Sequence, residues 1–165
     1  SKTNCLQLPM DEAVCMNTML EYLYAGQELY GALLGPLRTR YQLTTTELLV
    51  LLCLANDPQH DTARDIVETL RIAKSHVSVS VRALEKRGYI EGAYQGSNRR
   101  TIHLRLCEPA METIAAARQA QGQFLTILEQ DFSDEERARF RQYLHRMNNN
   151  IHTYLNERSA PPLPG

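Results

Sequence analysis

The stretch AKSHVSVSVRALEKRGYI, residues 73–90, gives two contradictory signals about its local structure. Its centre alternates apolar and polar residues from Val77 to Val81, which is the period-2 pattern of a strand. As a helix, the stretch places Val77, Val81 and Leu84 on one stripe. The helical stripe continues to Gly88, whereas the alternation lasts five residues. The sequence therefore predicts a helix that stops at Gly88, because β-branched residues cost a helix only a few tenths of a kcal/mol each.

Helical signals also precede this stretch. Apolar residues recur at helical spacing over residues 10–41 and predict one long helix. Thr44 and Glu47 have the spacing of a capping box and start a second, mostly apolar helix. Thr62 starts a third helix, which is short and runs to Leu70. Three helices are thus expected before the helix of residues 73–90.

A β-hairpin is predicted after Gly88. Residues 89–94 and 101–106 read as its strands, and Gln95-Gly96-Ser97-Asn98 as its turn. In the second strand we expect three residues to point inward and two outward: Ile102, Leu104 and Leu106, against His103 and Arg105. Residues 108–156 then read as two helices, the first with Pro109 at its first position and the second started by a capping box at Ser133. This order predicts a mainly α fold with a small β-hairpin wing, a winged helix-turn-helix with helical extensions.

The charge of the chain is unevenly distributed. The 165 residues carry a net charge of −1, which by itself does not favour nucleic acid as a partner. Residues 71–105, however, hold two acidic and eight basic residues, the latter being Arg71, Lys74, Arg82, Lys86, Arg87, Arg99, Arg100 and Arg105. A local basic patch of this kind is typical of proteins that contact phosphates.

From Leu43 to Met111 the chain resembles the MarR (multiple-antibiotic-resistance regulator) family of bacterial transcription factors. The resemblance is carried by Leu43-Thr44-Thr45-Thr46-Glu47-Leu48, by Leu84-Glu85-Lys86-Arg87-Gly88-Tyr89-Ile90 and by Asn98-Arg99-Arg100. It implies a single domain over residues 1–165. In this domain a winged helix-turn-helix DNA-binding lobe, 44–107, is flanked by dimerisation helices, 10–41 and 108–156.

Three positions depart from the pattern of the family. Asn98 replaces the usual Asp of the wing, so an ion pair with Arg100 is reduced to a neutral hydrogen bond. Ala73 stands where the recognition helix usually has a polar cap, at a local cost of about 1 kcal/mol. Cys107 replaces the usual Thr before the helix at Pro109.

The predicted DNA contacts follow from how a helix enters the major groove. Arg82 can read guanine, His76 and Ser75 can bond base edges, and Val79 can meet a thymine methyl. Lys74 is expected on a phosphate, and the resemblance implies that Arg99 or Arg100 enters the minor groove. The full set of expected DNA-binding residues is Lys74, Ser75, His76, Ser78, Val79, Arg82, Asn98, Arg99 and Arg100. The alternative for the wing arginines is a solvated hairpin turn.

The resemblance also implies a small-molecule effector, bound between the dimerisation helices and the DNA-binding lobe. Five side chains are candidates to line its pocket: Met16, Met19, Tyr24, Tyr30 and Tyr41. The alternative is that these side chains form the core of the dimer.

Other kinds of site find little support. The sequence has no nucleophile elbow, phosphate loop or zinc-protease motif, so no catalytic site, metal or cofactor is predicted. His145 and His152 are seven residues apart, but no further residue joins them at ligand spacing. The four cysteines, Cys5, Cys15, Cys53 and Cys107, are scattered. Cys53 is expected in the core, and redox sensing through Cys15 or Cys107 is an alternative.

The sequence as a whole predicts a homodimeric transcriptional repressor that binds a double-stranded, imperfectly palindromic operator and responds to an effector. The rival from another class is a winged-helix module for protein–protein contact. Because no apolar run approaches the ~20 residues that span a bilayer, we expect a cytoplasmic protein without a membrane partner.

Overall fold

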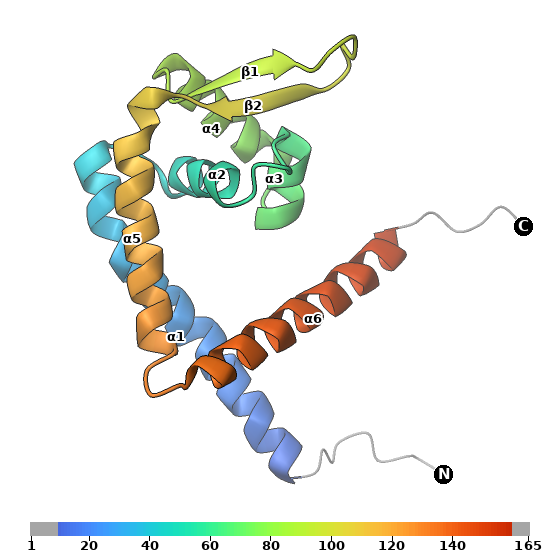
Figure 1. Cartoon of the computed structure of the whole chain (residues 1–165). Helices are drawn as coiled ribbons and strands as arrows, with labels where there is room; N and C mark the ends of the chain where they lie inside the picture. Colours follow the sequence, from blue (N-terminus) through green and yellow to red (C-terminus); the bar gives the residue numbers. More distant parts are fainter. Residues whose placement is uncertain (1–9, 160–165) are drawn as a thin grey trace, which may run out of the picture. The chain divides into compact units, whose positions relative to one another are not determined.

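A computed structural model describes residues 10–159 of the chain (Figure 1). Within this range, residues 10–124 form one compact unit, and residues 125–159 form a second. The elements are, in order, α1 (Met10–Tyr41), α2 (Thr45–Asn56), α3 (Ala63–Leu70), α4 (Lys74–Lys86), β1 (Ile90–Tyr94), β2 (Ile102–Leu106), the 3₁₀ turn η1 (Glu108–Ala110), α5 (Met111–Leu128) and α6 (Asp134–Ser159). The fold is mainly helical with one small hairpin, as predicted.

The opening stretch is a helix, α4, which confirms the helical interpretation over the strand. Val77 and Leu84 of the predicted stripe are fully buried, and Ser80 between them is buried too. At its C-terminus the amides of Gly88 and Tyr89 bond back to the carbonyls of Glu85 and Leu84, at 2.9 and 3.0 Å. This is the Schellman arrangement, in which the residue after the cap adopts a positive φ. Gly88 has φ +68° and so supplies the predicted stop.

The capping box predicted at Thr44 is present, and the cap predicted at Thr62 is a capping box as well. The amide of Glu47 donates to the Thr44 hydroxyl at 3.1 Å, and the Thr44 amide donates to the Glu47 carboxylate at 2.9 Å. Thr62 and Asp65 make the same pair of bonds at the start of α3. Burial alone would raise the pKa of Asp65, but the hydrogen bonds from Thr62 outweigh it and lower the pKa. Each helix therefore begins where its sequence specifies.

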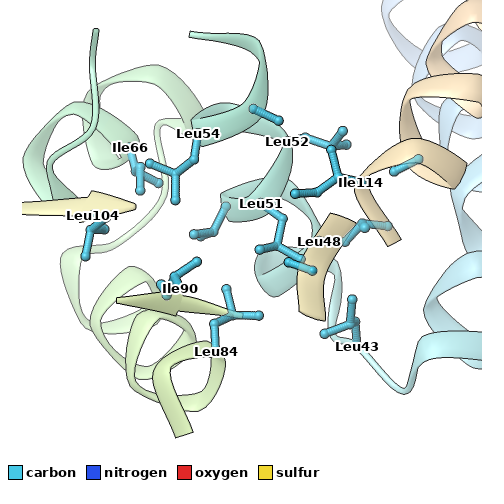
Figure 2. Packing of buried hydrophobic residues seen from close by; sticks show 14 of the residues in the cluster. Leu43, Leu48, Leu51, Leu52, Leu54, Ile66, Leu84, Ile90, Leu104 and Ile114 are labelled. Carbon is cyan, nitrogen blue, oxygen red and sulfur yellow. The ribbon is translucent and has the colours of Figure 1, made fainter. Parts of the chain in front are cut away.

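The hydrophobic core of the first unit is centred on α2 (Figure 2). Leu51 of this helix is buried completely, and the helix is apolar nearly all round, as expected of an element covered on several sides. Ile66 of α3, Leu84 of α4 and Ile114 of α5 complete the surroundings of α2. The core thus packs α4 and the base of the hairpin against α2.

The hairpin pairs β1 with β2 in antiparallel register, from Ile90 opposite Leu106 to Tyr94 opposite Ile102. The predicted orientation of β2 is only partly right. Leu104 is buried and Leu106 is half-buried, but Ile102 is 50% exposed because it pairs near the tip, beyond the core. His103, expected to point outward, is half-buried because its ring bonds Asp61 in the loop before α3.

The long helix α1 and the start of α5 belong to the first unit as well. Only the C-terminal part of α1 packs on the core, through residues such as Tyr30, Leu34 and Leu37. Pro36 lies inside α1, and the helix continues past it to Tyr41. Pro109 lies in the turn η1, which precedes α5, rather than in the α-helix itself.

The second unit contains the end of α5 and the helix α6. Ser133 and Glu136 form the predicted capping box, with bonds of 2.7 and 3.2 Å. In the turn before it, the buried carboxylate of Glu129 accepts two bonds of 3.1 Å from the guanidinium of Arg141. The ion pair compensates for the burial of this carboxylate, which would be strongly destabilising without a partner.

Candidate nucleic-acid interface

The outer face of α4 carries the side chains that the sequence predicted for base contact. Because Val77 and Leu84 face the core, Ser75, His76 and Arg82 face away from it and are exposed. Val79 is 59% exposed and is the apolar side chain of this face. Four of the predicted side chains, Ser75, His76, Val79 and Arg82, therefore share one free face, while Ser78 is only partly exposed at its margin.

The two ends of this face differ in their local chemistry. At the N-terminal end Lys74 is exposed, and among the described side chains none caps the helix at Ala73, as predicted. Further along, the Nε of Arg82 donates to the Ser78 carbonyl at 3.3 Å. This bond leaves the two Nη groups of Arg82 without a partner among residues 10–159, so they can serve an external acceptor.

The tip of the wing is exposed from Gln95 to Arg100. Gly96, with φ +56°, makes the tight turn possible. The guanidinium of Arg99 lies over the ring of Tyr94, 5.4 Å from its centroid. The Asn98 carboxamide accepts a 2.9 Å bond from the backbone amide of Arg100, instead of the predicted bond to its side chain. The Arg100 guanidinium takes no part in this bond, and the residue is exposed.

The base of the wing is held by Asp61, a residue that no sequence pattern singled out. The Asp61 carbonyl accepts a bond of 2.8 Å from the Leu104 amide. Its carboxylate bonds Nδ1 of His103 at 2.6 Å, and both side chains are less than a quarter exposed. Neither partner stands in a recognisable motif, so only the fold brings this contact together.

Not all of the basic residues between 71 and 105 point away from the protein. The guanidinium of Arg105 pairs with Glu91 across the hairpin. The guanidinium of Arg87 bonds the carbonyls of Tyr41 and Gln42 at the end of α1. Among the described residues around α4 and the wing tip, four exposed basic side chains make no such ion pair or carbonyl bond: Lys74, Lys86, Arg99 and Arg100. Arg82 is exposed too and uses only its Nε, in the bond to the Ser78 carbonyl. The cationic surface is smaller than composition suggested, but it coincides with the two predicted DNA-reading elements.

The sequence profile of the MarR family matches residues 41–100, which contain α2, α3, α4, β1 and the wing tip. Over these residues the chain matches the MarR family. Among curated proteins, none matches the sequence. The likeness to solved structures extends beyond the lobe that the MarR profile covers.

Three solved structures show the extent of this likeness. A putative MarR family transcriptional regulator from Listeria monocytogenes, complexed with a 26mer DNA, has a TM-score of 0.71 at 14% identity, covering 89% of this chain and 97% of that one. The transcriptional regulator PA3341 has a TM-score of 0.70 at 21% identity, covering 84% and 98%. BpsR of Bordetella bronchiseptica, whose DNA binding is regulated by 6-hydroxynicotinic acid, has a TM-score of 0.58 at 17% identity, covering 79% and 98%. At these identities the likeness establishes the fold.

Of the residues predicted for an effector pocket of the MarR type, Tyr30 lies at hollows in the surface. Its hydroxyl accepts a bond of 2.8 Å from Gln121, and its ring packs edge-on against Phe124 at 5.2 Å. One hollow, of about 200 Å³, lies between Tyr30, α2 and α3. A second, of about 330 Å³, is lined by Phe124 and by residues of α1 from Tyr22 to Tyr30. Three of the other candidates, Met16, Met19 and Tyr24, are exposed, and the Tyr41 hydroxyl bonds Glu112.

A third hollow lies beside the wing and was not predicted. It has a volume of about 500 Å³ and is bounded by α2, β2 and the start of α5, with Leu54, Leu106 and Ile114 among its apolar residues. No local pattern indicates it, since it arises where three elements meet.

The cysteines and histidines occupy scattered positions. Cys15 is exposed, and Cys53 and Cys107 are half-buried, whereas Cys5 lies outside the described residues. Burial raises the pKa of the Cys53 thiol, which disfavours its thiolate and agrees with a packing role. Within residues 10–159, no three metal-ligating side chains cluster. None of the helices in this range combines the length and the apolar character that a membrane span requires.

Proposed function

We propose that this protein is a sequence-specific DNA-binding transcriptional regulator. One observation carries the proposal: the free face of α4 presents Ser75, His76, Val79 and Arg82, and the neighbouring wing tip presents Arg99 and Arg100. A helix with polar and apolar side chains of this kind fits the major groove, and exposed arginines fit phosphates or the minor groove. The Listeria monocytogenes structure, which has the same fold, is a complex with DNA and supports this proposal.

The regulator acts as a homodimer in this proposal. In the N-terminal part of α1, Leu20, Leu23 and Tyr24 are exposed at helical spacing. Considered by itself, α6 also exposes an apolar stripe, which includes Leu144, Met147 and Ile151. Stripes of this length on single helices are typical of surfaces that become buried in an obligate dimer. Light scattering at micromolar concentration tests this directly, and a stable monomer would contradict it.

We further propose that the regulator is a repressor whose affinity for DNA is changed by a small-molecule effector. The support is that BpsR, of similar fold, has its DNA binding regulated by 6-hydroxynicotinic acid. In this chain Tyr30 lines two hollows, whereas Met16, Met19, Tyr24 and Tyr41 line neither of them and remain candidates on the grounds of the sequence resemblance alone.

The experiment that tests DNA recognition is selection of bound fragments from genomic DNA at physiological salt, followed by sequencing. A sequence-specific dimer is expected to enrich an imperfect palindrome with half-sites about 10 base pairs apart. Binding without enrichment of any sequence would contradict specific recognition. Absence of DNA binding would instead favour a winged helix that docks on another protein.

A further inference from the structure

The C-terminal ends of α1 and α4 meet at the side chain of Arg87. Its Nη1 donates to the Gln42 carbonyl at 2.9 Å, and its Nη2 donates to the Tyr41 carbonyl at 2.8 Å. Nη2 also lies 3.2 Å from the Tyr89 hydroxyl, and the guanidinium stacks over the Tyr89 ring at 4.6 Å. Arg87 therefore joins α4 to the end of α1 through two bonds to backbone carbonyls, while Tyr89, on its own side of the contact, helps to orient the guanidinium.

The carbonyls that Arg87 binds are ones that a helix end leaves without partners. The α1 helix closes with the Leu43 amide bonded to the Arg38 carbonyl at 2.9 Å, and Gln42 turns into the left-handed region at φ +53°. The Tyr41 and Gln42 carbonyls lie beyond this closure, at the negative end of the helix dipole. A planar guanidinium can satisfy two such carbonyls at once, which a lysine ammonium cannot do with the same geometry.

The start of α5 reaches the same helix end. One carboxylate oxygen of Glu112 accepts bonds from the Tyr41 hydroxyl at 2.9 Å and from Nη2 of Arg40 at 3.1 Å. The Arg40–Glu112 pair is largely exposed and contributes little stability by itself. Together with Arg87, however, it leaves the last turn of α1 in contact with both α4 and α5.

We propose that Arg87 is a positioning residue that sets the spacing between the two recognition helices of the dimer, and hence the half-site spacing of the operator. The proposal rests on the proposed function, in which α1 is a dimerisation helix. A bond network between α1 and α4 then transmits the geometry of the dimer to the DNA-reading face. Arg87 lies at the C-terminal end of α4, away from the N-terminal half that we expect to read bases, and both of its Nη groups already donate to acceptors within the protein.

The rival explanation is that Arg87 is one more phosphate contact in a basic segment. Lys86 offers a matched control, because it is the neighbouring cation, is exposed, and has no comparable bonds to α1. Removing one phosphate contact lowers the slope of log K against log salt by about 0.9. A positioning residue leaves this slope unchanged and alters the preference for spacing.

The experiment compares Arg87→Gln and Arg87→Lys with Lys86→Gln and the wild type. Binding is measured over a range of salt to the selected operator and to versions whose half-sites are one base pair closer or farther apart, at a temperature where circular dichroism shows each variant folded. For Arg87→Gln we expect on the order of a tenfold loss of spacing preference with an unchanged salt slope. Arg87→Lys is expected to keep part of the spacing preference. Lys86→Gln is expected to keep the spacing preference of the wild type.

A second measurement decides the question without DNA. Spin labels on a non-natural amino acid at position 76 report the distance between the two recognition helices of one dimer. We expect a narrow distribution in the wild type and a broader or shifted one in Arg87→Gln. Unchanged distances and unchanged spacing preference in this variant would overturn the proposal, and a lower salt slope would make Arg87 a phosphate contact. If the wild type binds no DNA, the proposed function fails, and the distances still decide whether Arg87 positions α4.

Discussion

The recognition helix α4 and the wing are both exposed, but they are held to the protein in different ways. Along α4, Val77 and Leu84 are buried completely, so its outer face is fixed at every turn. The wing is fixed at its base, where Leu104 is buried and bonded to Asp61, whereas its tip from Gln95 to Arg100 is exposed. Base reading requires side chains placed within a fraction of an ångström, and phosphate attraction tolerates more movement. From this comparison we expect α4 to provide sequence discrimination and the wing to provide general affinity.

The largest expected effect comes from removing the support of α4. Leu84→Ala deletes a completely buried side chain between α4 and α2, and we expect the free energy of unfolding to fall by about 2–5 kcal/mol. Urea denaturation followed by circular dichroism measures this change. Val79→Ala, on the exposed face of the same helix, is the control and is expected to change stability by less than about 0.5 kcal/mol. Equal effects of the two substitutions would show that α4 is not anchored through Leu84.

The next effect is on DNA recognition by α4. Arg82→Ala is expected to weaken operator binding by about 1–3 kcal/mol and to relax the preference at one symmetric base position, because a base contact carries sequence information. A binding matrix over all single-base variants of the operator measures both quantities. A uniform loss across all sequences, without relaxation at any position, would reassign Arg82 to a phosphate.

Substitutions in the wing are expected to lower the affinity for all DNA sequences and to leave the sequence preference unchanged. Arg99→Ala combined with Arg100→Ala should weaken binding to every sequence, on the order of tenfold, because we expect these side chains to meet phosphates and a groove of given width. The slope of log K against log salt should fall by about 0.9 for each phosphate that an arginine no longer neutralises. Salt titration of operator and random DNA measures this. If the double variant binds like the wild type at every salt concentration, the hairpin does not touch DNA, and a protein-docking role for the wing gains support.

The same contrast shows what the sequence could predict. The capping box at Thr44, the stripe through Val77 and Leu84 and the stop at Gly88 are specified by residues within a few positions of one another. Their interactions are local, so periodicity and capping rules sufficed to place α2 and α4.

The contacts that escaped prediction join segments far apart in the sequence. His103 was expected in solvent but bonds Asp61, 42 residues earlier. Arg87 was counted among the cations of the basic segment, but its acceptors are carbonyls 45 and 46 residues earlier. Ile102 alternates correctly for a strand, yet it lies past the edge of the core and is exposed. Composition and alternation carry no information on where a distant backbone carbonyl lies or where the core ends.

The smallest expected effect concerns the start of α4, the one point at which this helix is less well held than its neighbours. Thr44 and Thr62 cap α2 and α3, whereas Ala73 offers α4 no side-chain acceptor. Ala73→Ser supplies a hydroxyl that can accept from the amides of the first turn, and we expect the free energy of unfolding to rise by about 1 kcal/mol.

Chemical denaturation measures the gain from Ala73→Ser, and Ala73→Val serves as its control, because a β-branched side chain without an acceptor cannot cap the helix. A serine variant no more stable than the valine variant would mean that the first-turn amides gain nothing from an acceptor at this position. The amide of His76 already reaches the Ala73 carbonyl at 3.0 Å, in a short-range bond that the new hydroxyl must compete with. A gain well below about 1 kcal/mol would measure how much that local bond already compensates for the missing cap.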